Sequence, residues 1–336
     1  MSDPHGDRTF GPQGGIVPKG TVLDLSTCLN PYGPPSSVIE RAGQIDRLLL
    51  HRHPNHATAA IEELYALEMG MPASSFVATR GTSEAIWQLG RIFEGRQVSL
   101  LQPTYTEYVK AFAKANLLPG NGPIHTVSQL EAAAETSDGV IFSNPHNPTG
   151  TFMARDEILA VASAHPRCVF IVDESYTTFV DPADNPTVTG CDLDNVVTLH
   201  SPTKFFGMGG VRIGVAWSQS SALLESLRQQ RTTWPISMID ATLAEVAFAD
   251  KDWRQPVRQK LSNDVAWFDN WLTQQPGTYV TAGPLHFRLV TGDVDPLRDR
   301  LRARGVAVRK LDAVHGVGVP SLRITAPSES KRELLG

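Results

Sequence analysis

Short apolar runs recur through the middle of the chain and predict its main structural elements. Each run is four to seven residues long and rich in Val, Ile and Phe: Phe76–Thr79, Val98–Leu101, Gly139–Phe142, Cys168–Val172, Val196–Leu199 and Val211–Trp217. Runs in which apolar and polar residues do not strictly alternate are typical of strands covered on both faces. Helical patterns such as Ser83–Phe93 and Arg155–Ala164 separate several of them. This alternation predicts an α/β fold with a large, mainly parallel sheet covered by helices.

The flanks have a different pattern and predict a division into domains. Residues 1–37 are rich in Gly, Pro and polar residues, as expected of an N-terminal arm that joins a smaller domain. Residues 38–234 contain the alternating pattern and form the predicted large domain. Residues 235–336 read as helices followed by short strands, so we expect a smaller α+β domain built from both chain ends.

Composition narrows the class of protein. The chain has 336 residues, 41% of them hydrophobic, and a net charge of −5 from 30 basic and 35 acidic residues. The basic residues do not cluster, so we expect a small-molecule protein without nucleic-acid partners. There is no membrane-length apolar run and no signal-peptide pattern. Three widely spaced cysteines predict reduced thiols in a cytoplasmic protein.

Polar motifs follow the apolar runs at the point where each predicted strand ends. They are Arg80-Gly-Thr-Ser-Glu84, Pro103-Thr-Tyr105, Ser143-Asn-Pro-His-Asn-Pro-Thr-Gly150, Asp173-Glu-Ser-Tyr176 and Ser201-Pro-Thr-Lys-Phe-Phe-Gly207. Ligands of open α/β sheets bind beyond the carboxyl ends of the strands. Alone, each motif has an ordinary explanation as a helix cap, a turn or a surface lysine. Their joint occurrence in one order indicates an active site.

These residues carry a family resemblance that spans nearly the whole chain. The sequence resembles class I/II aminotransferases, which are fold-type I enzymes that use pyridoxal 5′-phosphate (PLP). Within them it is similar to the histidinol-phosphate aminotransferase and threonine-phosphate decarboxylase branch. The most specific parts are Asn144–Gly150, NPHNPTG, and Ser201–Gly214, SPTKFFGMGGVRIG. The resemblance implies the aspartate-aminotransferase-like fold and a homodimer with shared active sites.

The resemblance also implies roles for residues around the cofactor ring. Lys204 would hold PLP as a Schiff base and move the substrate Cα proton. Asp173 would pair with the pyridinium nitrogen, so that the ring acts as an electron sink. Asn147 and Tyr176 would hydrogen-bond the ring oxygen, and Tyr105 would stack on the ring. Lys204, Asp173 and Tyr176 are therefore the candidate catalytic residues.

The resemblance also implies which residues contact the cofactor phosphate and the substrate. The helix start that follows the first run is itself a suitable phosphate site. The candidate phosphate contacts are Gly81, Thr82, Ser83, Ser201, Thr203 and Arg212. Arg323 matches the arginine that grips the substrate α-carboxylate, and Arg309 is a candidate contact for a distal anion. Asn30 is a further candidate substrate contact.

Two departures from the family pattern concern the cofactor and the substrate. His53 stands where relatives often have a tyrosine that reaches the phosphate of the neighbouring subunit's PLP, and it can still donate a hydrogen bond. Cys28-Leu-Asn-Pro31 replaces an Asn-Glu-Asn-Pro segment of the aminotransferases. The apolar residue in place of the acid resembles the decarboxylase branch. No metal is expected, because His51, His53 and His56 lack nearby carboxylates or cysteines.

The first hypothesis is that the protein is a PLP-dependent aminotransferase. It would transfer an amino group between an amino acid or amino-alcohol phosphate, similar to histidinol phosphate, and a 2-oxo acid. Alternatives are a decarboxylase of the threonine-phosphate type found in the cobalamin pathway, or a specialised biosynthetic PLP enzyme acting on a non-standard amino acid. A PLP-dependent sensor role is disfavoured, because the N-terminal arm has no room for a helix-turn-helix. Transamination and decarboxylation differ in which Cα bond lies perpendicular to the ring.

Overall fold

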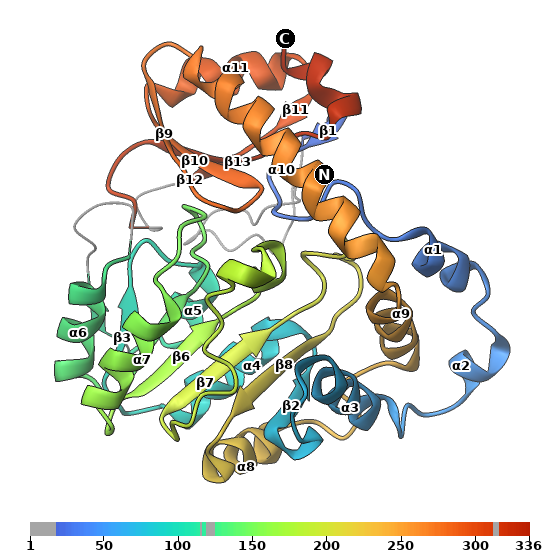
Figure 1. Ribbon diagram of the computed structural model, residues 1–336, viewed down its shortest axis with the longest axis vertical. Coiled ribbons are helices and arrows are strands. Elements are labelled where there is room, and N and C mark those ends of the chain that lie inside the picture. The colour runs from blue at the N-terminus through green and yellow to red at the C-terminus, as the bar shows by residue number, and fades with distance from the viewer. Residues whose placement is uncertain (1–17, 115, 119–124, 312–315) are drawn as a thin grey trace.

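The computed structural model describes residues 18–114, 116–118, 125–311 and 316–336. A seven-stranded sheet forms the centre of the larger part (Figure 1). In spatial order its strands are β2 (Phe76–Thr79), β8 (Gly214–Ser218), β7 (Val196–His200), β6 (Val169–Asp173), β5 (Gly139–Ser143), β3 (Val98–Leu101) and β4 (Asn116–Leu118). All pairs from β7 to β4 are parallel, whereas β8 runs antiparallel to both of its neighbours. The predicted mainly parallel sheet is confirmed.

Helices cover both faces of this sheet, which explains why its strands read as continuous apolar runs. One face packs against α4 (Gly81–Ile92), α5 (Thr106–Ala111) and α8 (Ser221–Gln230). The other packs against α3 (Ala57–Met69), α6 (Val127–Thr136), α7 (Arg155–Ala164) and α9 (Met238–Ala249). Strands β2, β3, β5, β7 and β8 are buried along their full length.

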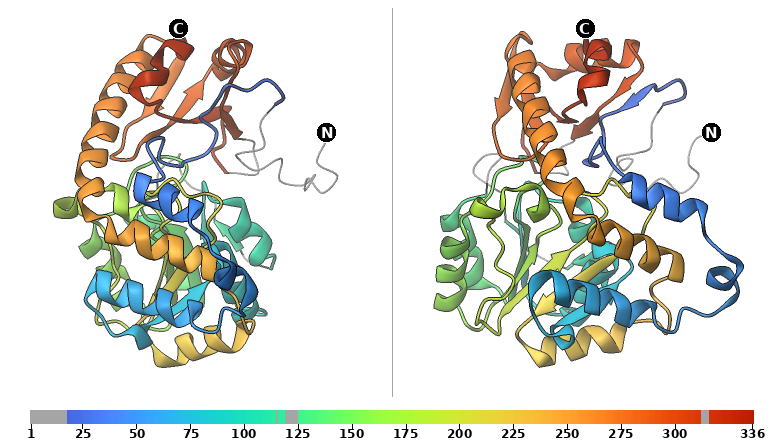
Figure 2. Two further views of the ribbon diagram at one scale, coloured as in Figure 1. Left: turned by 90° about the vertical axis from the view of Figure 1, so that its right-hand side faces the viewer. Right: turned by 45° about the vertical axis from the view of Figure 1, so that its right-hand side comes forward.

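A second, antiparallel sheet lies above the first and has the order β12 (Arg309–Leu311), β13 (Ser321–Thr325), β10 (Phe287–Gly292) and β9 (Thr278–Thr281). Its core includes residues of α10 (Lys251–Thr273) and α11 (Val294–Ala303). The chain start packs beside it, where β1 (Leu23–Asp24) pairs in parallel with β11 (Val306–Ala307) in a separate two-stranded sheet, and Leu25 shares the same core. Both ends of the described chain therefore contribute to this smaller part (Figure 2).

Helices α9 and α10, which follow the expected domain boundary at 234/235, link the two parts of the structure. Helix α9 packs against α3 and against α1 (Ser36–Gly43), so it belongs to the core of the large sheet. Helix α10 then runs from α9 to the smaller sheet (Figure 1). Its buried Val257 and Leu261 lie in the core of the large part, whereas Phe268 and Leu272 lie in the small one.

Short elements complete the described chain: α2 (Arg47–His51) and the 3-10 helices η1 (Ala73–Ser75), η2 (Thr177–Phe179), η3 (Pro182–Asp184) and η5 (Glu329–Leu335). Among the described residues no helix has both the length and the apolar character needed to cross a bilayer. The described residues also contain no cluster of three or more His, Cys, Asp or Glu side chains suited to a metal ion.

Candidate active site

A cavity of about 220 Å³ lies at the carboxyl ends of the large-sheet strands, and residues of the smaller sheet form part of its lining. Parallel strands place their C-terminal loops along one edge, so motifs far apart in sequence meet there. The predicted residues that line the cavity are Gly81, Thr82, Ser83, Tyr105, Asn147, Asp173, Tyr176, Ser201, Thr203, Lys204, Arg212, Arg309 and Arg323. Two predicted residues, Asn30 and His53, are not among its lining residues.

One end of the cavity is suited to a phosphate. Helix α4 begins there at Gly81, and its N-cap residue Arg80 makes no side-chain capping bond. The Arg212 guanidinium lies directly over this helix start, since a Cβ on Gly81 would come within 2.7 Å of Arg212 Nη2. Backbone amides, the helix dipole and a guanidinium all favour an anion. The hydroxyls of Ser201 and Thr203, 2.8 Å apart, lie on the same cavity wall.

Glycine is required at Gly81 and Gly214 by this close approach. Gly81 has a φ of +75°, and a Cβ on Gly214 would lie 2.5 Å from Thr82 N. Strand β8, which carries Gly214, pairs with β2 next to the start of α4. Only backbone without side chains lets these two segments meet beneath Arg212.

Asp173 ends β6 and presents its carboxylate to the cavity. Its Oδ1 accepts hydrogen bonds from Ser175 N at 3.0 Å and Ser175 Oγ at 2.5 Å. Its Oδ2 accepts one from the Tyr108 hydroxyl at 2.7 Å. Burial first, and then Asp173, raises the pKa of Tyr108 well above its ordinary value, so the phenol keeps its proton.

Lys204 lines the same cavity and is half-buried. Burial is the main cause that lowers the pKa of Lys204, and the positive charges of Arg323 and Arg212 lower it further. Cys28 and Asp173 act in the opposite direction. A lysine in this setting is a better nucleophile and base at neutral pH than an exposed one.

Asn30 supports the Lys204 loop from behind. Its backbone N–H donates to Lys204 O at 3.0 Å, and its Nδ2 donates to Phe205 O at 2.8 Å. Its Oδ1 accepts from Tyr32 N at 3.0 Å. The Asn30 amide therefore contacts backbone around the lysine and orients that loop.

Aromatic and thiol groups also line the cavity. Tyr105 forms a side-chain hydrogen bond with Ser83. Tyr176 hydrogen-bonds to the side chain of Cys28, and burial, followed by Cys28, raises its pKa well above the ordinary value. Cys28 was missed from the sequence, where it read as a reduced structural thiol. It is buried and lines the cavity.

The smaller sheet supplies two arginines to the cavity. Arg323 on β13 donates to Asn147 Oδ1 at 2.8 Å and to Ser26 O at 2.8 Å. Arg309 on β12 is its register partner in the antiparallel pair. The Asn147 side chain thus joins the large-sheet turn to the smaller sheet.

Two lining residues, Tyr108 and Ser175, were not among the predicted site residues, although both lie within three residues of one. His53 lies away from this cavity, on the surface. Its ring is exposed and stacks on Trp234, with centroids 4.1 Å apart and planes inclined by 13°.

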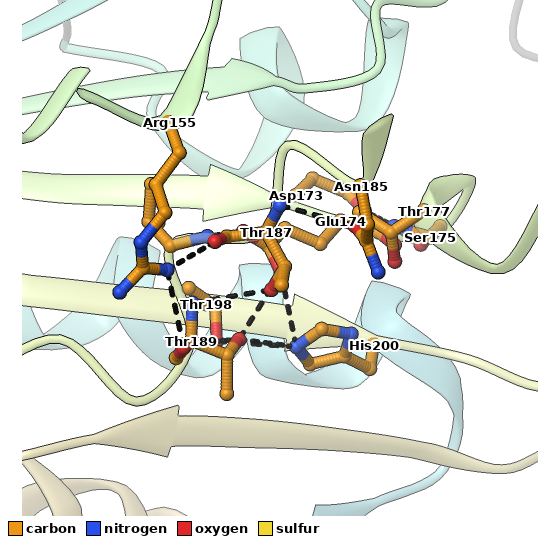
Figure 3. A network of polar contacts seen from close by, with 11 residues as sticks. Arg155, Asp173, Glu174, Ser175, Thr177, Asn185, Thr187, Thr189, Thr198 and His200 are labelled. Carbon is orange, nitrogen blue, oxygen red and sulfur yellow. Dashed lines mark hydrogen bonds and ion pairs between the residues drawn. The ribbon is translucent and has the colours of Figure 1, made fainter. Parts of the chain in front are cut away.

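A buried polar network lies directly behind the site (Figure 3). Glu174 follows Asp173, and its carboxylate accepts from Val188 N at 2.6 Å and from the Thr187 and Thr189 hydroxyls. His200, which precedes Ser201, lies 3.3 Å from the same carboxylate. Burial raises the pKa of Glu174 to about 7. The network ties the ends of β6 and β7 together.

Comparisons with known proteins give relatives that match most of the chain. The threonine-phosphate decarboxylase of Salmonella typhimurium is 27% identical over 337 residues, covering 96% of this chain and 91% of that protein. A histidinol-phosphate aminotransferase of Leuconostoc citreum is 26% identical over 298 residues, covering 85% and 84%. The crystal structure of histidinol-phosphate aminotransferase from Sinorhizobium meliloti in complex with pyridoxal-5′-phosphate has a TM-score of 0.83 at 20% identity, covering 94% and 89%.

These matches confirm the expected aspartate-aminotransferase-like fold of type I. The sequence pattern of the family described as "Aminotransferase class I and II" matches residues 20–335, which is nearly all of the chain. The chain therefore belongs to the class I and II aminotransferase family.

Proposed function

We propose that this protein is a PLP-dependent aminotransferase that transfers an amino group between an amino acid or amino-alcohol phosphate and a 2-oxo acid. One observation carries the proposal: a single cavity brings together the amine of Lys204, the carboxylate of Asp173 and the anion site of Arg212 at the start of α4. These three groups match the aldehyde, the pyridine nitrogen and the phosphate of PLP.

The remaining lining residues fit the same cofactor. Ser201 and Thr203 add hydroxyls beside the phosphate site. Asn147 and Tyr176 would hydrogen-bond the ring oxygen, and Tyr105 would stack on the ring. When bound, PLP supplies an electron sink that stabilises negative charge at the substrate Cα.

The residues of this chain would bind the substrate and move its proton. Lys204, whose pKa is lowered by burial and by the two neighbouring arginines, would accept the Cα proton on its Nζ and return it. Arg323 would orient the α-carboxylate, since a guanidinium fork matches two carboxylate oxygens. Arg309 would contact a second anionic group, which favours a substrate with a distal phosphate.

Decarboxylation on the same cofactor is the second candidate. The Salmonella typhimurium relative, a threonine-phosphate decarboxylase, matches 96% of this chain. The segment Cys28-Leu-Asn-Pro31 also lacks the acidic residue that we associate with the aminotransferases. In this reaction the bond between Cα and the carboxylate, in place of the Cα–H bond, would break and release carbon dioxide, with the electron pair left on Cα.

We further infer a cytoplasmic homodimer with shared active sites. His53 supports this inference, because it lies on the surface with its ring held by Trp234 and outside the cavity of its own chain. In a dimer it would donate a hydrogen bond to the phosphate in the neighbouring subunit.

The test is single-turnover spectroscopy of the PLP-loaded protein with a panel of amino acids and their phosphates. Visible absorbance of the lysine-bound cofactor and carbon dioxide release are measured in the same samples. Bleaching to pyridoxamine phosphate with formation of a 2-oxo acid and no carbon dioxide establishes transamination. Carbon dioxide release with recovery of the absorbance establishes decarboxylation and contradicts the first assignment.

A further inference from the structure

We infer that Tyr108 and Ser175 are positioning residues that hold both oxygens of the Asp173 carboxylate, so that it meets the cofactor ring nitrogen in one orientation. The inference rests on the proposed function and deepens it, because it assigns roles to two residues beside the PLP partner. Neither residue was a candidate from the sequence motifs.

Hydrogen bonds hold the Asp173 carboxylate at both of its oxygens. Ser175 donates twice to Oδ1, from N at 3.0 Å and from Oγ at 2.5 Å, while Tyr108 donates to Oδ2 at 2.7 Å. Rotation of the carboxylate about its Cβ–Cγ bond would break bonds at both oxygens. Hydrogen bonds to a charged acceptor are about twice as strong as neutral ones, so this orientation is strongly favoured.

Tyr108 is suited to this task by its burial and its place in the fold. The side chain is 1% exposed and lies on the first turn of α5, three residues after Tyr105. The two rings are perpendicular, with centroids 5.6 Å apart. One helix turn therefore carries both the proposed ring-stacking tyrosine and the hydroxyl that holds Asp173. Because burial and Asp173 raise the pKa of Tyr108, its hydroxyl remains a donor.

Ser175 reaches the other oxygen from the segment that follows β6. It is buried, lines the cavity and lies next to Asp173 (Figure 3). Two independent segments, α5 and the end of β6, thus converge on one carboxylate. Partners that orient the ligands of metal sites typically contribute about 10- to 100-fold to activity, and by analogy we expect an effect near the lower end of this range here.

The test uses Tyr108→Phe, Ser175→Ala and the double variant, each loaded with PLP labelled with ¹⁵N at the ring nitrogen. The ¹⁵N chemical shift reports ring protonation without any substrate. We expect each single variant to move the shift toward that of Asp173→Ala, and the double variant to move it furthest. With the donor found in the substrate panel, kcat should fall about 10-fold for each single variant, while KM changes less than about twofold.

Matched control variants distinguish a positioning role from a general effect of removing a buried hydroxyl group. Tyr65→Phe and Ser218→Ala remove buried hydroxyls that lie outside the cavity lining, and they should leave the ¹⁵N shift unchanged. Ser175→Thr retains a hydroxyl donor and should restore the wild-type shift.

The inference is overturned if the single and double variants keep the wild-type ¹⁵N shift and kcat, or if the controls shift the signal equally. Failure of the proposed function is distinguishable from this result. In that case the wild-type protein itself would show no absorbance of lysine-bound PLP.

Discussion

Arg309 and Arg323 lie directly opposite each other in the antiparallel pair of β12 and β13, and both line the cavity. Like charges in directly opposed positions destabilise a sheet. Directly opposed positions project to the same face of a sheet, so both guanidinium groups reach the cavity, and this arrangement is suited to bind anionic groups there. Arg323 is oriented further by its bonds to Asn147 Oδ1 and Ser26 O.

The two arginines should respond differently to substitution. Arg323→Gln should reduce kcat/KM for every substrate with an α-carboxylate by about 30-fold, corresponding to about 2 kcal/mol for a charge-assisted hydrogen bond. Arg309→Gln should reduce kcat/KM mainly for substrates with a distal phosphate. Steady-state kinetics with paired substrates, with and without the phosphate, measure the difference. Equal losses for both substrates in Arg309→Gln would contradict the role of Arg309.

Lys204→Ala should abolish the visible absorbance of bound PLP and nearly all turnover. The variant loses both the covalent attachment and the proton-transferring amine, and the latter alone contributes about 10²- to 10⁴-fold. Lys251→Ala, which removes an exposed lysine beside a different cavity, is the matched control and should retain both properties. A Lys204→Ala protein that kept its absorbance and turnover would refute the assignment.

Gly81→Ala should weaken PLP binding at least about 10-fold through displacement of Arg212, which is a loss of about 1.4 kcal/mol. The added Cβ would approach Arg212 Nη2 to 2.7 Å. Equilibrium binding of PLP measures the effect. Gly95→Ala is the control, because Gly95 has a similar φ of +78° and nothing within 4 Å of its added Cβ.

Both glycine substitutions should lower the free energy of unfolding by about 1–2 kcal/mol, since each places a side chain in the left-handed region. Only Gly81→Ala should change PLP affinity. Equal affinity losses in the two variants would mean that the effect comes from destabilisation and not from the Arg212 site.

Glu174 should make folding stability depend on pH up to neutrality. Burial raises the pKa of its carboxyl from 4.5 to about 7, so the folded state retains a proton that the unfolded chain has released between these values. Its contribution to stability is therefore fully present below about pH 4.5 and is lost as the pH rises through about 7, by at most about 3 kcal/mol. Burial lowers the pKa of His200 to about 3, so this ring stays neutral across the window.

Urea unfolding of wild type and Glu174→Gln across this pH window measures that contribution. The stability of the variant should fall less with rising pH, because glutamine does not titrate. Glu225→Gln, on the exposed face of α8, is the control and should retain the wild-type slope. An unchanged slope in Glu174→Gln would show that Glu174 does not titrate in this range.

The hydrophobic pattern by itself determined most of the strands and helices. Phe76–Thr79, Val98–Leu101 and Arg155–Ala164 have the same bounds in the sequence analysis and in the structure. These elements are predictable because burial of one or both faces of an element gives the sequence a local pattern of apolar residues. The expected strand at Val211–Trp217 instead begins at Gly214, because Arg212 turns toward the cavity before the ladder with β2 starts.

The polar motifs similarly indicated which residues would line the cavity, since the loops after parallel strands converge on one edge of a sheet. Tertiary structure alone decided which side chains meet there. Tyr108 and Asp173 are 65 positions apart, and Arg212 reaches Gly81 only because β8 pairs with β2. Local periodicity records which face of an element is buried. It does not record strand order or the crossing of helices, and these determine which distant polar groups come within hydrogen-bonding distance.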